Sequence, residues 1–293
     1  MCRGWAPVGY RLVASPALSG IRWGEEGPVP SDSDARPFEV GVLRDAFASG
    51  QLLLVYQPIF DLRTSAFVGV EALIRWRHPR LGLLGPDAFI GTLESSDLVG
   101  PVGRWTLETA CDQGAIWHDA GYRFRVSVNV SARQWAESDL VEDVRFALDE
   151  SRFDPGLLVL EVSRATLHSD PGAAERLSAL AAMGVHRAVD DFVPGGDELA
   201  YLSGVGVDVV KIDRSFVAGR GDADADAVTA LARRAETLGI QVIAAGIEDA
   251  SQRERFAREQ IASGQGFGLS QPYEADEIDR YLEDFSIFSG KPL

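Results

Sequence analysis

The sequence has little of what several classes of protein require. Its 293 residues include only two cysteines, Cys2 and Cys111. Two are too few for a disulfide scaffold, so a reducing compartment is expected. No stretch approaches the roughly 18 to 20 apolar residues of a membrane span, and the first residues lack the apolar core of a signal peptide. These absences predict a cytoplasmic protein with no membrane partner.

Positive charge is also scarce, since the formal net charge is −16. Long nucleic acid and anionic membrane surfaces are bound through a basic field, so neither is an expected partner. A small nucleotide held by one local arginine remains compatible with this charge. Hydrophobic residues form 46% of the chain, and α/β barrels of about 250 residues commonly form one domain. One barrel with a short extra segment therefore fits the length.

The chain divides into two regions by composition. Residues 1–36 are rich in glycine, proline and serine and end in GEEGPVPSDSDARP, which is typical of a tail or linker. From residue 37 to 293, strand-like apolar runs alternate with amphipathic helical stretches in a single domain. The strands are expected at 52–59, 66–73, 124–130, 157–163, 185–190, 208–212, 240–245 and near 264–267. The helices are expected at 38–49, 87–98, 102–120, 138–151, 171–183, 222–238, 249–261 and 275–285.

The order of these runs predicts the fold class. Most strands are near-continuous runs of Val, Ile and Leu, as in parallel strands that are covered on both faces. Gly121, Gly184 and Gly239 stand where a glycine ends a helix. Eight strands with helices between them predict an α/β protein with a TIM-like (β/α)₈ barrel. A doubly wound open sheet is the alternative, but no glycine-rich phosphate turn follows the first strand.

Polar side chains gather where five successive strands end. They are Glu71, Asn129, Glu161, the pair Asp190 and Asp191, and Lys211. The carboxyl ends of barrel strands converge on one face, where such enzymes place their chemistry. Any one of these residues taken alone fits a helix cap or a solvent-facing group, and Lys211 also fits a salt bridge in an acidic barrel mouth. Together they form an oxygen-rich set suited to Mg²⁺ or Mn²⁺, as in metal-assisted phosphodiester hydrolysis.

Seven ordered blocks resemble the EAL family of cyclic-di-GMP phosphodiesterases. The first is YQPIFDLRTSAFVGVEALIRWRHPRLGLLGPDAFI, which contains the signature Glu71-Ala72-Leu73. The others are NVSARQ at 129–134, LEVS at 160–163, VDDF at 189–192, KIDRSFV at 211–217, VIAAGIED at 242–249 and QGFGLSQP at 265–272. The match covers about residues 37–286 and implies an EAL-type barrel.

The resemblance implies hydrolysis of cyclic di-GMP to linear pGpG with Mg²⁺ or Mn²⁺. The first metal would be held by Glu71, Asn129, Glu161 and Asp190. Asp190 would bridge to a second metal beside Asp191, and Lys211 would contact the nucleophilic water.

The nucleotide contacts also follow from the resemblance. Gln57, Leu73 and Arg75 would contact the dinucleotide, with Gln265 near the catalytic water or a guanine edge. Arg75 would pair with a phosphate, because its planar fork matches two phosphate oxygens; a surface arginine is the alternative. His78 is interpreted as structural. Many members of the family dimerise, so a homodimer is expected on the same ground.

One departure from the family pattern removes a ligand of the second metal. The family's EGVE block reads Ala245-Gly246-Ile247-Glu248, so its first glutamate is an alanine. Glu248 survives, but three residues further along it is not expected to reach the same place.

Two other departures lie beside the Asp190–Asp191 pair. Arg164 replaces the second glutamate of the family's ExTE block, which supports the loop after Asp191. Restoring a glutamate there is expected to help hydrolysis. In that loop Val193 replaces a glycine, and Pro194 removes a backbone donor. Residues 195–198 spell GGDE, the start of a diguanylate cyclase signature, but no cyclase-like sequence surrounds them.

Three functions follow from these observations. The first is a degenerate EAL domain that binds cyclic di-GMP and signals through a protein partner or its own dimer. The second is a working phosphodiesterase in which Asp191, Glu248 or water replaces the lost ligand. The third is a protein-interaction scaffold that binds no nucleotide.

Overall fold

The described strands close into a barrel. The computed structural model describes residues 38–137, 139–194, 197–218 and 222–289. Within them, eight strands form a ring in the order β1-β9-β8-β7-β6-β5-β4-β2, which a β1–β2 pairing completes, and β3 extends β2 outside the ring. The strands are β1 (Leu52–Asp61), β2 (Phe67–His78), β3 (Gly82–Leu84), β4 (Arg125–Val130), β5 (Leu158–Ser163), β6 (His186–Phe192), β7 (Val209–Ile212), β8 (Gln241–Ala245) and β9 (Ser263–Gln265). The predicted TIM-like α/β barrel is confirmed.

The strict alternation of strand and helix fails at the first strand. β1 runs antiparallel to both of its neighbours, β2 and β9, whereas the pairs from β2–β4 round to β8–β9 are parallel. A hairpin joins β1 directly to β2. Its turn is held by Asp61, whose Oδ1 accepts from the amides of Arg63 and Thr64 at 3.0 and 2.7 Å. This local turn leaves no room for the connecting helix that a (β/α)₈ pattern implies.

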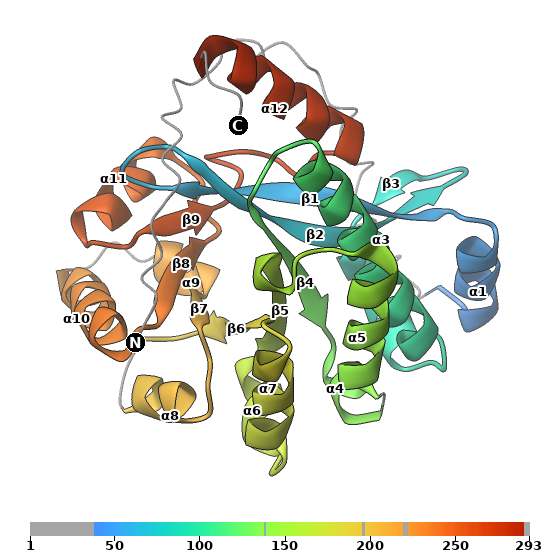
Figure 1. Cartoon of the computed structure of the whole chain (residues 1–293), viewed down its shortest axis with the longest axis horizontal. Helices are drawn as coiled ribbons and strands as arrows, with labels where there is room; N and C mark the ends of the chain where they lie inside the picture. Colours follow the sequence, from blue (N-terminus) through green and yellow to red (C-terminus); the bar gives the residue numbers. More distant parts are fainter. Residues whose placement is uncertain (1–37, 138, 195–196, 219–221, 290–293) are drawn as a thin grey trace.

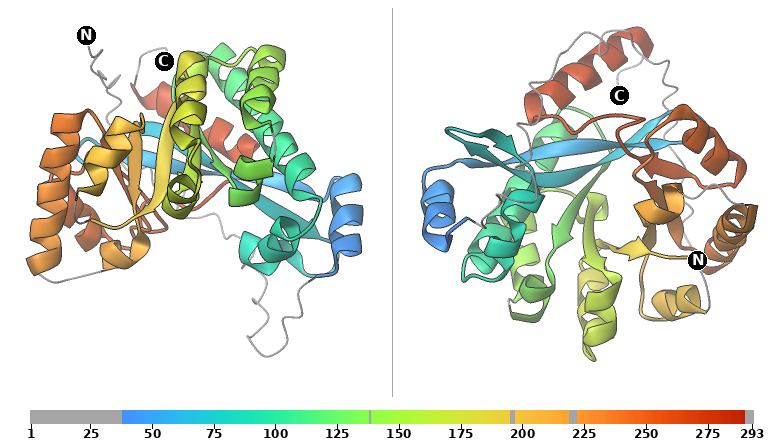
Figure 2. Two further views of the ribbon diagram at one scale, coloured as in Figure 1. Left: turned by 90° about the horizontal axis from the view of Figure 1, so that it is seen from below. Right: turned by 180° about the vertical axis from the view of Figure 1, so that it is seen from behind.

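Helices surround the barrel (Figures 1 and 2). They are α1 (Val40–Ala48), α2 (Ile90–Glu94), α3 (Val99–Asp119), α4 (Ala132–Glu137), α5 (Leu140–Ser151), α6 (Arg164–Ser169), α7 (Ala173–Ala182), α8 (Glu198–Gly204), α9 (Arg214–Ala218), α10 (Asp222–Leu238), α11 (Ala250–Arg258) and α12 (Ala275–Ser289), with short 3₁₀ turns η2 (Pro86–Ala88) and η3 (Pro155–Leu157). The helix expected at 87–98 is divided between η2 and α2. The turns at α4, α6, α8 and α9 are too short to show a helical period in the sequence. Gly121, Gly184 and Gly239 have φ of 95°, 91° and 71°, which confirms them as left-handed helix ends.

The two faces of each strand have different surroundings. One face packs against the helices and forms most of the hydrophobic core. The other face points into the barrel, where Val159, Ala188 and Val209 form a small apolar layer with Ile243 against it. Because side chains alternate along a strand, the residues two positions further on point into the barrel one layer higher. That next layer carries the polar groups of the site.

The tail expected at residues 1–36 lies outside the described residues and stays a prediction. None of the described helices is long and apolar enough to cross a membrane.

Candidate functional site

The upper interior layer contains three charged side chains and one alanine. Glu161, Asp190, Lys211 and Ala245 each lie two residues beyond a member of the apolar layer, on β5, β6, β7 and β8 respectively. Glu71 enters the same space from β2, where it pairs in register with Ser127 of β4. Glu71 therefore lies in the middle of its strand rather than near its end, because β2 continues to His78.

Lys211 lies between the two glutamates. Its Nζ donates to Glu71 Oε2 at 2.8 Å and to Glu161 Oε2 at 2.6 Å. All three side chains are almost completely buried. Glu71 also accepts hydrogen bonds from Asn129 Nδ2, at 2.7 Å, and from Gln265 Nε2. The salt bridge that was an alternative for Lys211 is therefore present, and it joins two of the expected metal ligands.

The two glutamates titrate differently because their partners differ. Burial works to raise the pKa of Glu71, but Lys211, Gln265 and Asn129 all donate to it and hold that pKa below its usual value. Glu161 has only the ammonium, and its Oε1 is buried without a hydrogen-bond partner. Burial therefore raises the pKa of Glu161 to about 7 against the opposing effect of Lys211. The two carboxylates raise the pKa of Lys211 against the effect of burial, so this lysine stays charged.

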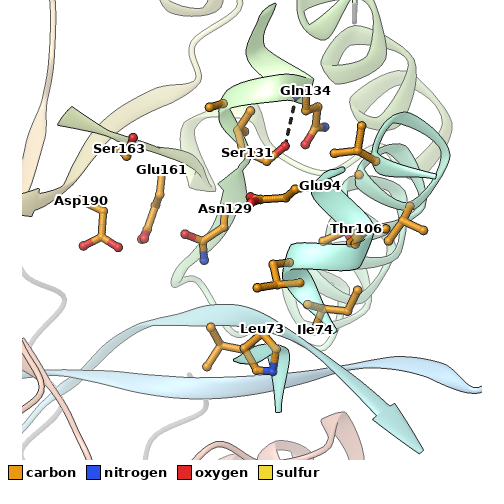
Figure 3. Close-up of a pocket in the computed structure, with 18 of the residues that line it drawn as sticks. Leu73, Ile74, Glu94, Thr106, Asn129, Ser131, Gln134, Glu161, Ser163 and Asp190 are labelled. Carbon is orange, nitrogen blue, oxygen red and sulfur yellow. Dashed lines mark hydrogen bonds between the residues drawn. The ribbon is translucent and has the colours of Figure 1, made fainter. Parts of the chain in front are cut away.

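A cavity of about 400 Å³ opens beside this cluster. It lies within the usual size range of small-molecule sites. Figure 3 shows Asn129, Glu161 and Asp190 in a row on neighbouring strands, with the oxygen of Asn129 turned toward Glu161. The far wall is mainly apolar and includes Ile74, Ile90, Leu93, Val99 and Val102. The cavity thus joins a carboxylate-rich end to a surface suited to a flat aromatic group.

Some lining residues were not expected from the sequence. They are Glu94, Thr106, Ser131, Gln134 and Ser163. Ser131 and Gln134 follow β4 directly, so their place after a strand end was an available signal. Glu94 and Thr106 come from helices far along the chain from the strand ends, and nothing in the sequence pattern marks them.

The expected nucleotide contacts share one face of the β1–β2 ribbon. Glu71, Leu73 and Arg75 alternate along β2 with outward-facing core residues, and Gln57 lies opposite Glu71 in register. Leu73 lines the cavity. Gln57 is buried and donates to the carbonyl of Ser270 at 3.3 Å. Arg75 is also buried, and its Nη1 donates to the carbonyl of Ile74 at 2.9 Å, so it is not a surface arginine.

Two other expectations concern His78 and Glu248. The Nδ1 of His78 accepts from the amides of Arg80 and Leu81 at 3.2 and 3.1 Å, which supports its structural interpretation. The side chain of Glu248 is exposed after β8, and its amide donates to Gln252 at 2.6 Å.

A bulge places Asp190 and Asp191 at the rim. The register between β6 and β7 shifts between Val189 and Phe192, and Asp191 has a left-handed backbone with φ of 57°. Burial raises the pKa of Asp191, and its acidic neighbours Asp190 and Asp213 raise it further. Bonds from Ser215 lower the pKa of Asp213. Asp191 is therefore the weaker acid of the two rim carboxyl groups.

Asp213 is the residue that the sequence reading missed. It lies two positions after Lys211, beyond the end of β7, so strand alternation offered a signal for it. Val193 does not adopt a left-handed backbone, since the four non-glycine residues with positive φ in the described chain are Ser65, Arg152, Asp191 and Gln260.

The oxygen donors are of the kind that a hard divalent cation prefers, although they do not converge on a common position. Among the described residues, no three acidic, histidine or cysteine side chains gather closely enough to hold an ion. Lys211 holds two of them, and Glu161 keeps one buried oxygen unpartnered. Mg²⁺ or Mn²⁺ would be held by the expected set of Glu71, Asn129, Glu161 and Asp190, with Asp191 beside it. Such an ion lowers the pKa of a bound water and offsets charge on phosphate oxygens.

Arg164 has a partner of opposite charge. Its Nη1 lies 2.9 Å from Oε2 of Glu198, the last residue of the GGDE string. A glutamate at position 164 would face this carboxylate, so we no longer expect that substitution to help hydrolysis. Residues 195–196 of the string lie outside the described part of the chain.

The affinity for Mn²⁺ is expected to fall as the pH is lowered below 7. The pKa of Glu161 is raised to about 7, so below this pH a proton occupies the carboxyl that the ion needs. The affinity should change about tenfold per pH unit below 7 and little above it. Calorimetric titrations from pH 5.5 to 8 measure this slope. A flat profile across pH 6 to 8 would contradict it.

Comparisons with known proteins agree with this geometry. Residues 41–272 match the family model described as the EAL domain. The bifunctional diguanylate cyclase/cyclic di-GMP phosphodiesterase MucR of Pseudomonas aeruginosa is 38% identical over 240 residues, which are 80% of this chain and 35% of MucR. The cyclic di-GMP phosphodiesterase NbdA of the same organism is 34% identical over 255 residues, 86% of this chain and 33% of NbdA. The chain thus spans about a third of the length of these curated relatives.

Solved structures give the same result. The structure titled PaMucR phosphodiesterase, c-di-GMP complex, has a TM-score of 0.77 and 37% identity, and covers 82% of this chain and 98% of that one. The EAL domain of DcpA from Mycobacterium smegmatis has a TM-score of 0.67 and 31% identity, over 80% of this chain and 98% of that one. The family match, the barrel and the rim carboxylates coincide, and the chain belongs to the EAL domain family.

Proposed function

We propose that this chain binds cyclic di-GMP at the barrel mouth and hydrolyses it weakly or not at all. The observation that carries the proposal is Ala245. Its side chain lies in the interior layer that holds Glu161, Asp190 and Lys211, and it offers no oxygen there. Catalysis by two metals needs donors for both ions, and each 1.4 kcal/mol of lost stabilisation costs about tenfold in rate.

Support for nucleotide binding comes from residues that do not depend on position 245. The cavity combines an apolar wall with a carboxylate-rich end that an ion would neutralise. Gln57, Arg75 and Gln265 are buried; Gln265 donates to Glu71, and Gln57 lies opposite Glu71 in the β1–β2 ladder. The MucR phosphodiesterase structure, 37% identical to this chain, is a complex with c-di-GMP.

A working phosphodiesterase is the second candidate, and Asp213 favours it. This carboxylate is close enough to Asp191 to raise its pKa, so the rim holds one more acidic group than the expected ligand set. Asp191 and Asp213 together would then replace the missing glutamate as donors for a second ion.

One pair of assays separates these functions. The purified chain is titrated with cyclic di-GMP by calorimetry, with and without Mn²⁺, and the same mixtures are followed for linear pGpG by chromatography. Binding without steady product supports the proposal, whereas steady product supports the second candidate. Absence of heat at high micromolar cyclic di-GMP would contradict both and leave a protein-interaction scaffold.

Arg75→Ala is expected to weaken cyclic di-GMP binding at least about tenfold, because a charge-assisted contact to phosphate is lost. Mn²⁺ affinity should not change. Glu71→Ala should instead weaken Mn²⁺ binding.

Arg77→Ala is the matched control for the Arg75 variant. Arg77 lies two residues further along β2, is 58% exposed and pairs with Glu274 at 2.5 Å. Equal effects at positions 75 and 77 would contradict the assignment of Arg75.

A further inference from the structure

Two basic side chains on α6 hold one carboxylate on α8. Arg164 Nη1 lies 2.9 Å from Oε2 of Glu198, and His168 Nε2 lies 3.0 Å from its Oε1. The Glu198 side chain is 15% exposed. The His168 ring also stacks on Tyr201 of α8, with centroids 5.0 Å apart and planes at 13°. We call these four residues the α6–α8 clamp.

The clamp connects the segments that follow β5 and β6, the two strands that carry Glu161 and the Asp190–Asp191 pair. Arg164 directly follows Ser163, the last residue of β5, and Ser163 pairs with Asp190 of β6 in the parallel ladder. Glu198 is the first residue of α8, the next element after β6. The clamp therefore lies where the strands that carry Glu161 and the Asp190–Asp191 pair leave the barrel.

The backbone at Asp191 needs support of this kind. Asp191 is left-handed, and the ladder to β7 is irregular between Val189 and Phe192. A non-glycine residue keeps this conformation only where the surrounding structure enforces it. β5 and the start of α6 support one side of the bulge, and the clamp fixes the helix into which the chain continues.

We propose that Arg164 and Glu198 are positioning residues that hold Asp190 and Asp191 in place for a divalent cation. The role in cation binding rests on the proposed function. Arg164 begins the helix that follows β5, and Glu198 begins the helix that follows β6. Their ion pair therefore joins the two segments through which these strands leave the barrel.

A charge-reversal cycle tests the proposal in the full chain. Its variants are Arg164→Glu, Glu198→Arg and the double variant. Hydrogen exchange at the amides of residues 191–193 is measured by NMR without metal, and Mn²⁺ affinity is measured by calorimetry. Each single variant should raise the exchange rates and weaken Mn²⁺ binding about twofold to fivefold, the range of a partly exposed ion pair. The double variant should restore both.

Two controls isolate the position from the charge. Arg164→Lys keeps the charge and should remain near the unmodified protein. Arg123→Glu breaks a comparable ion pair with Asp154, 2.7 Å long, between residues that precede β4 and β5 at the other end of the barrel. It should change neither exchange at 191–193 nor Mn²⁺ affinity.

The outcomes are distinct. Unchanged exchange in both single variants, or no recovery in the double variant, would overturn the clamp. Faster exchange with unchanged Mn²⁺ affinity would overturn the positioning role. If the unmodified chain binds neither Mn²⁺ nor cyclic di-GMP, the proposed function fails. The hydrogen-exchange measurements then test the clamp without the metal titration, since recovery of slow exchange in the double variant supports the ion pair.

Discussion

Replacing Lys211 with methionine is expected to lower the free energy of unfolding of the metal-free protein by about 3–5 kcal/mol. The methionine side chain is unbranched, one atom shorter and uncharged, so Glu71 and Glu161 are left facing each other without the ammonium. Both carboxyl groups are almost fully buried, and removing one partner of a buried ion cluster leaves uncompensated charge. Chemical denaturation without metal measures the loss.

The pH dependence of this loss has a definite sign. Without Lys211 the pKa values of the two buried carboxyl groups rise above their unfolded values. Their protonated forms then stabilise the fold below about pH 4.3, the ordinary pKa of glutamate, and this contribution disappears as the pH rises through the raised values. The deficit of the variant should therefore be largest near pH 8 and smallest near pH 5.

An exposed pair provides the control for this variant. Arg44 pairs with Asp97 at 2.7 Å, with side-chain exposures of 51% and 70%. Arg44→Met should cost no more than about 1 kcal/mol, because surface ion pairs contribute little. If the Lys211 and Arg44 variants lost similar stability, the central role of the lysine would be refuted.

Ala245→Glu is expected to raise hydrolysis of cyclic di-GMP in Mn²⁺ at least about tenfold, which corresponds to 1.4 kcal/mol of transition-state stabilisation. The new carboxylate would enter the interior layer beside Gln265, with which position 245 pairs in the β8–β9 ladder. It would supply the oxygen donor that a second ion lacks. Release of linear pGpG, followed over time, measures the gain.

Ala245→Gln is the matched control, since it has almost the same shape and no charge. It should leave hydrolysis unchanged. A gain of equal size in both variants would assign the effect to packing, and no gain in either would place the defect elsewhere in the site.

The barrel could be predicted from the sequence because parallel strands that are buried on both faces consist of nearly continuous apolar residues. The antiparallel course of β1 was missed, although the short gap between the strands expected at 52–59 and 66–73 left no space for a helix. The side-chain partners were harder still. Lys211 contacts glutamates 140 and 50 positions away, and Arg164 contacts Glu198 across 34 positions. Local sequence patterns do not predict contacts between residues so far apart in the chain.

Asp213 shows the opposite case. Its distance of two residues from Lys211 follows from strand alternation, so a stricter use of that rule places it at the rim. The Ala245 interpretation came instead from the resemblance, because Ala245-Gly246-Ile247-Glu248 aligns with the family's EGVE block.

The lysine between Glu71 and Glu161 has a consequence for how the barrel responds to its ionic surroundings. The Lys211 ammonium already balances part of the negative charge of these two glutamates. Folding of the barrel therefore does not depend on a bound cation at this place. In the proposed function, a divalent ion would compete with the Lys211 ammonium for the same carboxylate oxygens. Occupancy should then follow the free concentration of the ion, while the architecture persists when that concentration is low.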